Sequence, residues 1–360
     1  MTRVAILVLL STALCAAPLA AAAAPAAYKA PRTAFGQPDM MGFWTNSTLT
    51  PFMRPAKFGD RAVLTPDEVK AQEGASADLI KAGNAPSDPN GGAEAGKADP
   101  AKIRPEFAAA AGDTGGYNIG WLEPGASVMR VGGQPRSSIL TTANGQMPPR
   151  IAGARPAGFG APRAAGGRRM SSYDNPENRP LGERCIIGFG SNAGPPMIAN
   201  GFYNNNYQIL QTPDAVVIDV EMNHDLRIIR LNGKHRTDGV RPYFGDSIGH
   251  WEGDTLVVET TNLPKVQEFG GSENLKITER FTRTAPDRVR YAFTLDDPTT
   301  WAQPWGGEYE FAPLKGQIYE YACHEGNYAL PGVLGGARAQ EREAAEGKPA
   351  ADKAGGDDDQ

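Results

Sequence analysis

Short runs of Val, Ile, Thr and Tyr recur from about residue 136 onward, and several of them alternate apolar with polar side chains. In residues 215–222, Ile218 and Val220 fall on one face of an extended chain, while Asp219 and Glu221 fall on the other. Alternation with a period of two residues is typical of a β-strand. The pattern predicts strands at residues 137–142, 207–211, 215–222, 226–231, 249–251, 255–262, 275–284, 288–295, 308–311 and 318–323.

Tight turns separate many of these strands. Pro213-Asp214, Asn232-Gly233 and Pro286-Asp287 supply a preset or positive φ where the chain reverses. No long helical pattern lies between the strands, so an antiparallel meander is favoured over parallel strands joined by helices. A sheet of this size must protect its edges. We therefore predict an all-β fold in which an antiparallel meander closes into a β-barrel, with a two-sheet sandwich as the alternative.

The chain before the strands is less regular. Residues 65–68 read Thr-Pro-Asp-Glu, which is a good helix start, and we expect this helix to end before Gly74 and a second short one to follow at 77–82. Residues 83–113 and 150–169 are rich in Ala, Gly and Pro, so we expect loops there. The predicted organisation is a signal peptide at 1–26, a loop-rich segment with one or two short helices at 27–135, a β-barrel domain at 136–336 and a disordered acidic tail at 337–360.

Composition and charge narrow the classes of function. A chain of 360 residues is long enough for one large domain. Its 43 glycines and 30 prolines exclude a helical bundle or a coiled coil. A net charge of −5 argues against nucleic-acid binding through a generally basic surface. We therefore expect a small-molecule ligand or substrate and no nucleic-acid partner, and the oligomeric state stays open.

The N-terminus predicts export. A short basic start is followed by an uncharged apolar run over residues 4–28, with small residues in its second half. This order is typical of a cleaved secretory signal, and Pro18 argues against the alternative of a retained membrane anchor. Leu14 stands before Cys15 where a lipoprotein signal needs a small residue. We expect a periplasmic or secreted protein with no stable membrane insertion after cleavage.

Cleavage leaves two cysteines, Cys185 and Cys323. In an oxidising compartment an isolated pair is most simply one disulfide. The alternative, a zinc site that uses both cysteines and histidine, has no Cys-x-x-Cys to support it.

Two polar clusters contain candidate catalytic residues. In the first, which follows the strand at 215–222, His224 is a candidate general base held by Asp225, with Glu221 as a second carboxylate and Arg227 to stabilise an anion. The second cluster, on the strand at 318–323 beside the predicted disulfide, places the alternative pair at His324 and Glu325, followed by Asn327. Each cluster could equally be a turn stitched together by ordinary hydrogen bonds. A metal shared between them is disfavoured, because strand residues three apart face opposite sides, and we expect neither a metal nor an organic cofactor.

Other motifs point to weaker alternatives. Gly245-Asp-Ser-Ile-Gly249 matches the nucleophile-elbow pattern G-x-S-x-G, but the helix that must follow an elbow is absent from the prediction. Aromatic side chains interleaved with amides would suit a sugar ring or a flat organic ligand. The same rings could simply pack the core. The residues expected to bind substrate in this way are Tyr207, Asn205, Asn206, Trp301, Trp305 and Asn327.

Several stretches together resemble a family of secreted bacterial proteins to which no general activity is assigned. They include YNNNYQILQT (203–212), EMNHDLRII (221–229), GDSIGHWEGDTLVVETTN (245–262), DDPTTWAQPW (296–305) and YEYACHEGN (319–327). The resemblance covers most of the chain outside the signal, the Ala/Gly-rich loops and the tail, and it implies no activity. This chain has His250 where the family pattern has arginine, which lowers interest in His250 as a catalyst. Gly42-Phe-Trp44 also looks like the G-x-W opening of lipocalin-type barrels, a likeness of fold only.

The sequence thus supports three hypotheses. The first is an enzyme doing cofactor-free acid–base chemistry, as a lyase, isomerase or hydrolase, on a small organic or sugar-like molecule. The second is a non-catalytic, ligand-binding β-barrel, and the third is an envelope-associated structural protein. An enzyme predicts that His224 and a carboxylate converge in one pocket, whereas a binder predicts an apolar cavity with both histidines outside it.

Overall fold

A computed structural model describes residues 28–83, 123, 125–154, 173–188, 192–199, 203–264 and 270–347. The expected signal peptide, most of the expected Ala/Gly-rich loops and the end of the expected tail lie outside these residues.

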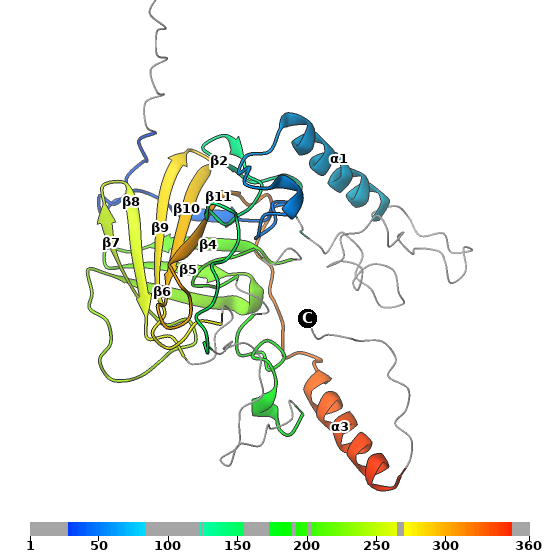
Figure 1. Cartoon of the computed structure of the whole chain (residues 1–360). Coiled ribbons are helices and arrows are strands. Elements are labelled where there is room, and N and C mark those ends of the chain that lie inside the picture. The colour runs from blue at the N-terminus through cyan, green and yellow to red at the C-terminus, as the bar shows by residue number, and fades with distance from the viewer. Residues whose placement is uncertain are drawn as a thin grey trace, which may run out of the picture.

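The described chain forms a closed β-barrel (Figure 1). Around the barrel the strands run in the order β1, β11, β10, β9, β8, β7, β6, β5, β4, and β4 pairs with β1 to close the ring. Every pair is antiparallel except β6 and β7, which are parallel. The strands are β1 (Gly42–Thr45), β4 (Asn206–Gln211), β5 (Ala215–Val220), β6 (Asp225–Leu231), β7 (Asp246–Glu252), β8 (Thr255–Thr261), β9 (Lys276–Ala285), β10 (Arg288–Asp296) and β11 (Trp305–Pro313).

The prediction of an all-β barrel is confirmed, with differences in detail. β1 lies in the segment that we placed outside the barrel domain, yet it bridges β4 and β11. Residues 137–142 form no strand but only an isolated bridge from Leu140 to Gly307. Residues 318–323 are irregular and largely exposed, so the predicted last strand was wrong. Tyr321 is half-buried against the hydrophobic core although its backbone joins no ladder, and periodicity alone does not distinguish these two cases.

The lumen is filled by side chains from alternate strand positions. In β6 buried and exposed residues alternate strictly, and Ile229 faces in while Ile228 is 56% exposed. Aromatic rings occupy the centre: the ring centroid of Tyr291 lies 4.8 Å from that of Phe281 and 5.3 Å from that of Phe311. When side chains pack this densely, the interior of the barrel is a hydrophobic core rather than a ligand cavity.

Long N-terminal segments cover one side of the barrel. Helix α1 (Pro66–Gly83) begins with a capping box, because Thr65 Oγ1 accepts the N–H of Glu68 and the Glu68 carboxylate accepts the N–H of Thr65. The helix continues through Gly74, so the expected stop there and the separate piece at 77–82 are one helix. A small hairpin of β2 (Arg130–Val131) and β3 (Gln134–Pro135) packs nearby.

After β11 the chain leaves the barrel as an irregular strap, which we define as residues 314–328. A disulfide between Cys185 and Cys323 ties the strap to residues 173–188. Helix α3 (Ala329–Ala345) follows and stands away from the barrel with no buried residue, so the expected tail begins inside a helix (Figure 1). Within the described residues, neither helix is long and apolar enough to cross a membrane.

Two glycines test how tightly the barrel is packed. A Cβ at Gly306, in β11, would lie 2.0 Å from the carbonyl oxygen of Phe293, whereas a Cβ at Gly74, inside α1, would meet nothing within 4 Å. We expect Gly306→Ala to lower the free energy of unfolding by about 1–3 kcal/mol through overpacking. Gly74→Ala, the matched control, should raise it by about 0.5–1 kcal/mol because alanine favours the helix. Urea unfolding measures both, and equal effects would contradict the packing described here.

Candidate functional site at the rim of the barrel

Three strands bring polar side chains to one end of the barrel. β4 begins there, β5 ends there and β6 begins there, because Val220 is in register with both Tyr207 and Asp225. Four acidic and amide side chains gather at this end, and all except Glu123 are less than 7% exposed. We call them the rim cluster: Glu123, Asn206, Glu221 and Asp225.

Asn206 links two carboxylates of the rim cluster. Its Nδ2 donates to Glu221 Oε2 at 2.6 Å and to Glu123 Oε2 at 2.9 Å. The other oxygen of Glu221 accepts the backbone N–H of Tyr319 at 2.9 Å, so the strap passes beside it. Desolvation raises the pKa of Glu123, and the negative charge of Glu221 adds to this effect. A proton is therefore held more readily here than on a free carboxyl group.

Asp225 is buried without a cation to neutralise it. Its carboxylate accepts the backbone N–H of Gly188 at 2.8 Å and the side-chain amide of Asn223 at 3.1 Å. In the described chain no Lys or Arg forms an ion pair with it. Burial raises the pKa of Asp225 to about 6, and the hydrogen bonds and the nearby His224 only partly oppose this. Asp225 therefore changes protonation close to neutral pH.

His224 lies beside Asp225 in sequence but points into solvent. No described residue hydrogen-bonds to its ring, so the expected pair in which Asp225 orients His224 is not formed. The turn that carries it is unusual: Asn223 has φ 61° and His224 has φ 50°, both in the left-handed region. Consecutive residues in this region are costly in backbone energy. The turn thus holds His224 outward and Asp225 inward.

Arg227 faces the lumen two residues further along β6. Its guanidinium forms a two-point ion pair with Glu279 on β9, with distances of 3.0 and 2.6 Å, and both side chains are at most 1% exposed. Tyr291 donates to Glu279 Oε1 at 2.7 Å. Arg227, expected to stabilise a developing anion, is instead neutralised by a buried partner. The sequence held a signal for this partner, since Glu279 stands at an inward position between Ile277 and Phe281.

A segment that we call the plug, residues 192–199, closes the rim end of the lumen. The N–H of Met197 donates to the Tyr291 hydroxyl at 2.8 Å, and Asn192 Nδ2 donates to Asn205 Oδ1 at 2.8 Å. Asn205 is thus a buried link between the plug and β4. In the described chain the buried Oδ1 atoms of Asn46, Asn192 and Asn206 have no hydrogen-bond partner. This end of the barrel therefore holds spare acceptors that are buried and have no partner among the described residues.

The second predicted cluster does not join the rim cluster. His324, Glu325 and Asn327 are exposed on the strap. Asn327 Nδ2 donates to the carbonyl oxygen of Cys323 at 3.0 Å, which stabilises the turn next to the disulfide. Because residues 318–323 are not a strand, nothing orients these side chains toward the barrel end. The strap reaches the cluster through the backbone N–H of Tyr319, which donates to Glu221.

The predicted aromatic binding residues are packed in the core. Trp301 and Trp305 are each 2% exposed and contact one another edge to face at 5.3 Å, and Tyr207 is fully buried. Asp297 caps the following turn, since it accepts from Thr299 and Thr300. These rings fill space rather than line an opening. In a small barrel, large side chains that point inward occupy the lumen and leave no room for a ligand.

Neither a serine hydrolase nor a metal centre has structural support. Ser247 lies inside β7 and hydrogen-bonds to Thr260 Oγ1 at 2.8 Å, with no elbow and no histidine beside it. Across the described residues no three His, Cys, Asp or Glu side chains come together as a metal site.

The comparisons with known proteins add no family. No family model, no curated protein and no solved structure matches this chain. The geometry of the site therefore carries the functional argument.

The buried ion pair gives a stability prediction. Glu279→Gln removes the partner of Arg227 and leaves a charge in the lumen, so we expect it to lower the free energy of unfolding by about 3–5 kcal/mol. The double variant Arg227→Met/Glu279→Met should recover most of this loss, because two apolar side chains carry no desolvation cost. Urea unfolding of the three proteins measures this. A double variant as unstable as Glu279→Gln would contradict the proposed origin of the effect.

Proposed function

We propose that this protein is a secreted or periplasmic enzyme that performs cofactor-free acid–base chemistry on a small polar, organic or sugar-like molecule at the rim cluster. Lyase, isomerase and hydrolase reactions all need such chemistry. Asp225 is the proton-transferring group, and Glu221 and Glu123 form the second acidic centre.

One observation carries the proposal: Asp225 is a buried carboxyl group whose pKa is raised to about 6 and which has no cation partner among the described residues. Burying such a group costs stability at neutral pH, because its charged form loses hydration. Proteins retain costs of this kind mainly at functional sites, where a general acid or base needs a pKa near the working pH.

The other members of the rim cluster fit the same role. The amide of Asn206 holds Glu221 and Glu123 together, and the raised pKa of Glu123 provides a second group that can carry a proton. Two carboxyl groups in different environments can divide the roles of acid and base. The costly left-handed turn at Asn223 and His224 sets the direction of Asp225.

Export fits the chemistry of the chain. The disulfide between Cys185 and Cys323 is typical of a protein from an oxidising compartment. The apolar N-terminal run and the resemblance to secreted bacterial proteins support the same location.

Asp225→Asn tests the role of Asp225 by separating stability from activity. The pKa of Asp225 is higher in the folded protein than the usual 3.8. The buried carboxylate therefore does not lower the free energy of unfolding below about pH 4, and it lowers it by the full amount above about pH 6. We expect Asp225→Asn to raise the free energy of unfolding at pH 7, by on the order of 1–3 kcal/mol, and to leave it unchanged at pH 4. Urea unfolding at the two pH values measures this.

The same variant should lose turnover. Residues 27–360 would be incubated with a small-molecule extract of the host, and new masses would be sought by mass spectrometry. We expect a product from the wild type, a limb near pH 6 in its rate profile, and at least a hundredfold slower formation by Asp225→Asn. Asp219→Asn, on the outer face of β5, is the matched control and should behave as the wild type. Full turnover by Asp225→Asn would overturn the assignment.

A second function is favoured by the spare acceptors at the rim end. The unpartnered Oδ1 atoms of Asn46, Asn192 and Asn206 are buried, and they could accept hydrogen bonds from a ligand rich in hydroxyl or ammonium groups once the segments that cover them moved aside. The protein would then bind such a molecule without converting it. Depletion of one compound to no more than one equivalent, with no new mass, would identify this function and exclude the enzyme.

A further inference from the structure

Like the pairing of β1 with β11, the junction between β6 and β7 is one of the two shortest in the barrel. These strands pair in parallel at only two positions, Arg230 with Ile248 and Leu231 with Gly249. A parallel pair cannot be joined by a tight turn, so the chain between them makes a long connection over residues 232–245. Most of that connection is exposed. Contacts between side chains must therefore hold the connection and the two strands together, because the backbone ladder is so short.

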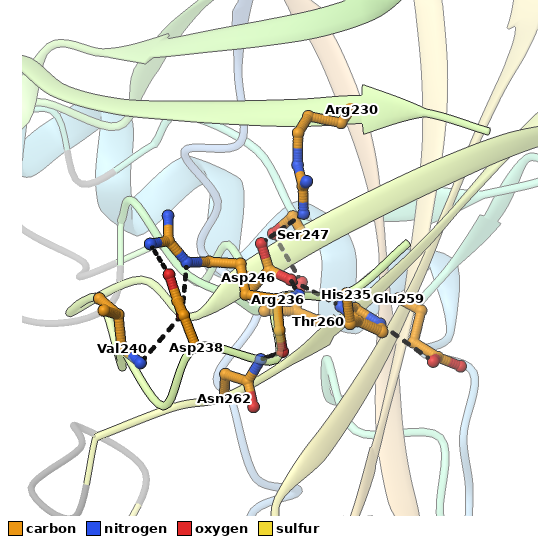
Figure 2. A network of polar contacts seen from close by, with 10 residues as sticks. All are labelled: Arg230, His235, Arg236, Asp238, Val240, Asp246, Ser247, Glu259, Thr260 and Asn262. Atoms are coloured by element: carbon orange, nitrogen blue, oxygen red, sulfur yellow. Dashed lines mark hydrogen bonds and ion pairs between the residues drawn. The ribbon is translucent and has the colours of Figure 1, made fainter. Parts of the chain in front are cut away.

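A polar network supplies it, centred on the buried Asp246 of β7 (Figure 2). Asp246 accepts from Arg230 Nη2 at 2.6 Å, from the backbone N–H of Arg236 at 2.8 Å and from His235 Nδ1 at 3.0 Å. Arg230 belongs to β6, whereas His235 and Arg236 belong to the connection. One carboxylate thus ties β6, β7 and the connection together.

His235 makes a second contact on its other side. Its Nε2 lies 3.2 Å from Glu259 Oε1 on β8, so each ring nitrogen faces a carboxylate oxygen. A carboxylate only accepts hydrogen bonds, and a neutral imidazole carries one N–H. Both contacts are therefore hydrogen bonds only when the ring is the doubly protonated imidazolium.

The charges around the ring support that form. Burial would raise the pKa of Asp246, but the donors from Arg236 and His235 hold it below its usual value. The hydrogen bond from Lys276 on β9 leads the lowering of the pKa of Glu259. Both carboxylates are thus ionised at neutral pH. Arg230 pairs with Asp246, Lys276 with Glu259 and Arg236 with Asp238, so these three cations each face an acid rather than the ring.

We propose that His235 is a pH-dependent latch, whose imidazolium form holds the connection 232–245 against β7 and β8 and whose deprotonation releases it. When the ring loses a proton, one nitrogen presents a lone pair to a carboxylate, and that contact becomes repulsive. Because the imidazolium gives up its proton as the pH rises, the latch is closed at the lower pH and open at the higher pH. The stabilisation is present at low pH and lost as the pH rises.

Released backbone at this junction would expose the edges of β6 and β7. The backbone N–H of Arg236 would lose its hydrogen bond to Asp246. The carbonyl oxygen of Arg236 would still accept a hydrogen bond from Asn262 Nδ2, just after β8, at 3.1 Å. The rest of the barrel stays closed, because its other strand pairs are antiparallel and none of them includes a residue of the connection 232–245. The effect is therefore local opening rather than global unfolding.

Hydrogen exchange of the chain 27–360 at pH 5.5 and 8.5 tests the latch. After correction for intrinsic exchange rates, we expect protection of peptides from 232–245 to fall about 3- to 10-fold at the higher pH, while peptides from β10 keep theirs. His235→Gln should show the low protection at both pH values. His250→Gln is the matched control: His250 pairs with the exposed Glu252 on the outer face of β7, so the pH effect should persist.

A second variant guards against a folding defect in His235→Gln. Glu259→Gln keeps the contact with His235 but replaces the carboxylate by an amide that can donate, so a neutral ring is tolerated and the pH effect should shrink at least twofold. Protection that is equal at both pH values in the wild type would overturn the proposal. So would a full pH effect in Glu259→Gln.

Discussion

The ion pair between Arg227 and Glu279 is the interaction on which the interior of the barrel depends. It spans the lumen from β6 to β9, and Tyr291 extends it from β10 to the plug through the N–H of Met197. Two charges in so apolar a space are tolerated only because each neutralises the other and the hydrogen bonds have well-defined geometry. This requirement fixes the relative positions of three strands and of the segment that closes their end.

Two buried aspartates show how surroundings assign different roles to one residue type. Asp246 receives hydrogen bonds from a guanidinium, an imidazole and a backbone amide, and its pKa is lowered. Among the described residues, the donors to Asp225 are neutral, and burial raises its pKa to about 6. The first is a structural anchor whose charge is fully compensated. Asp225 can gain or lose a proton near pH 6, and this property supports the proposed acid–base chemistry at the rim.

Backbone strain is concentrated near the end of the barrel that carries the rim cluster. Cys185, Asn204, Asn223 and His224 all have positive φ, and they lie in the segments that border the rim cluster. Asparagine and histidine adopt this conformation more readily than most residues, whereas cysteine does so at greater cost. The disulfide and the hydrogen bond from Tyr319 to Glu221 hold the strap against these segments. Cross-links from distant parts of the chain thus over-determine a local geometry that the turn alone would not keep.

Strand periodicity and turn chemistry determined most of the fold from the sequence alone. The alternation in β4, β5, β6, β9 and β10 and the turns between them needed only local information, because side-chain direction in a strand follows from position. The helix start at Thr65 and the disulfide could also be predicted from the sequence. The sequence also drew attention to Glu221, Asp225 and Arg227 as a polar cluster at a strand end.

Only the tertiary structure decided which of these residues face one another. Glu279 is 52 residues from Arg227, and Glu123 is 98 residues from Glu221, so no local pattern could pair them. The exposure of His224 follows from two left-handed residues in its turn, and the burial of Trp301 and Trp305 follows from closure of the barrel. Closure itself needed β1, a four-residue strand too short to be recognised by period. Local sequence sets the direction of each side chain, but burial, and with it protonation and pairing, depends on contacts between distant segments.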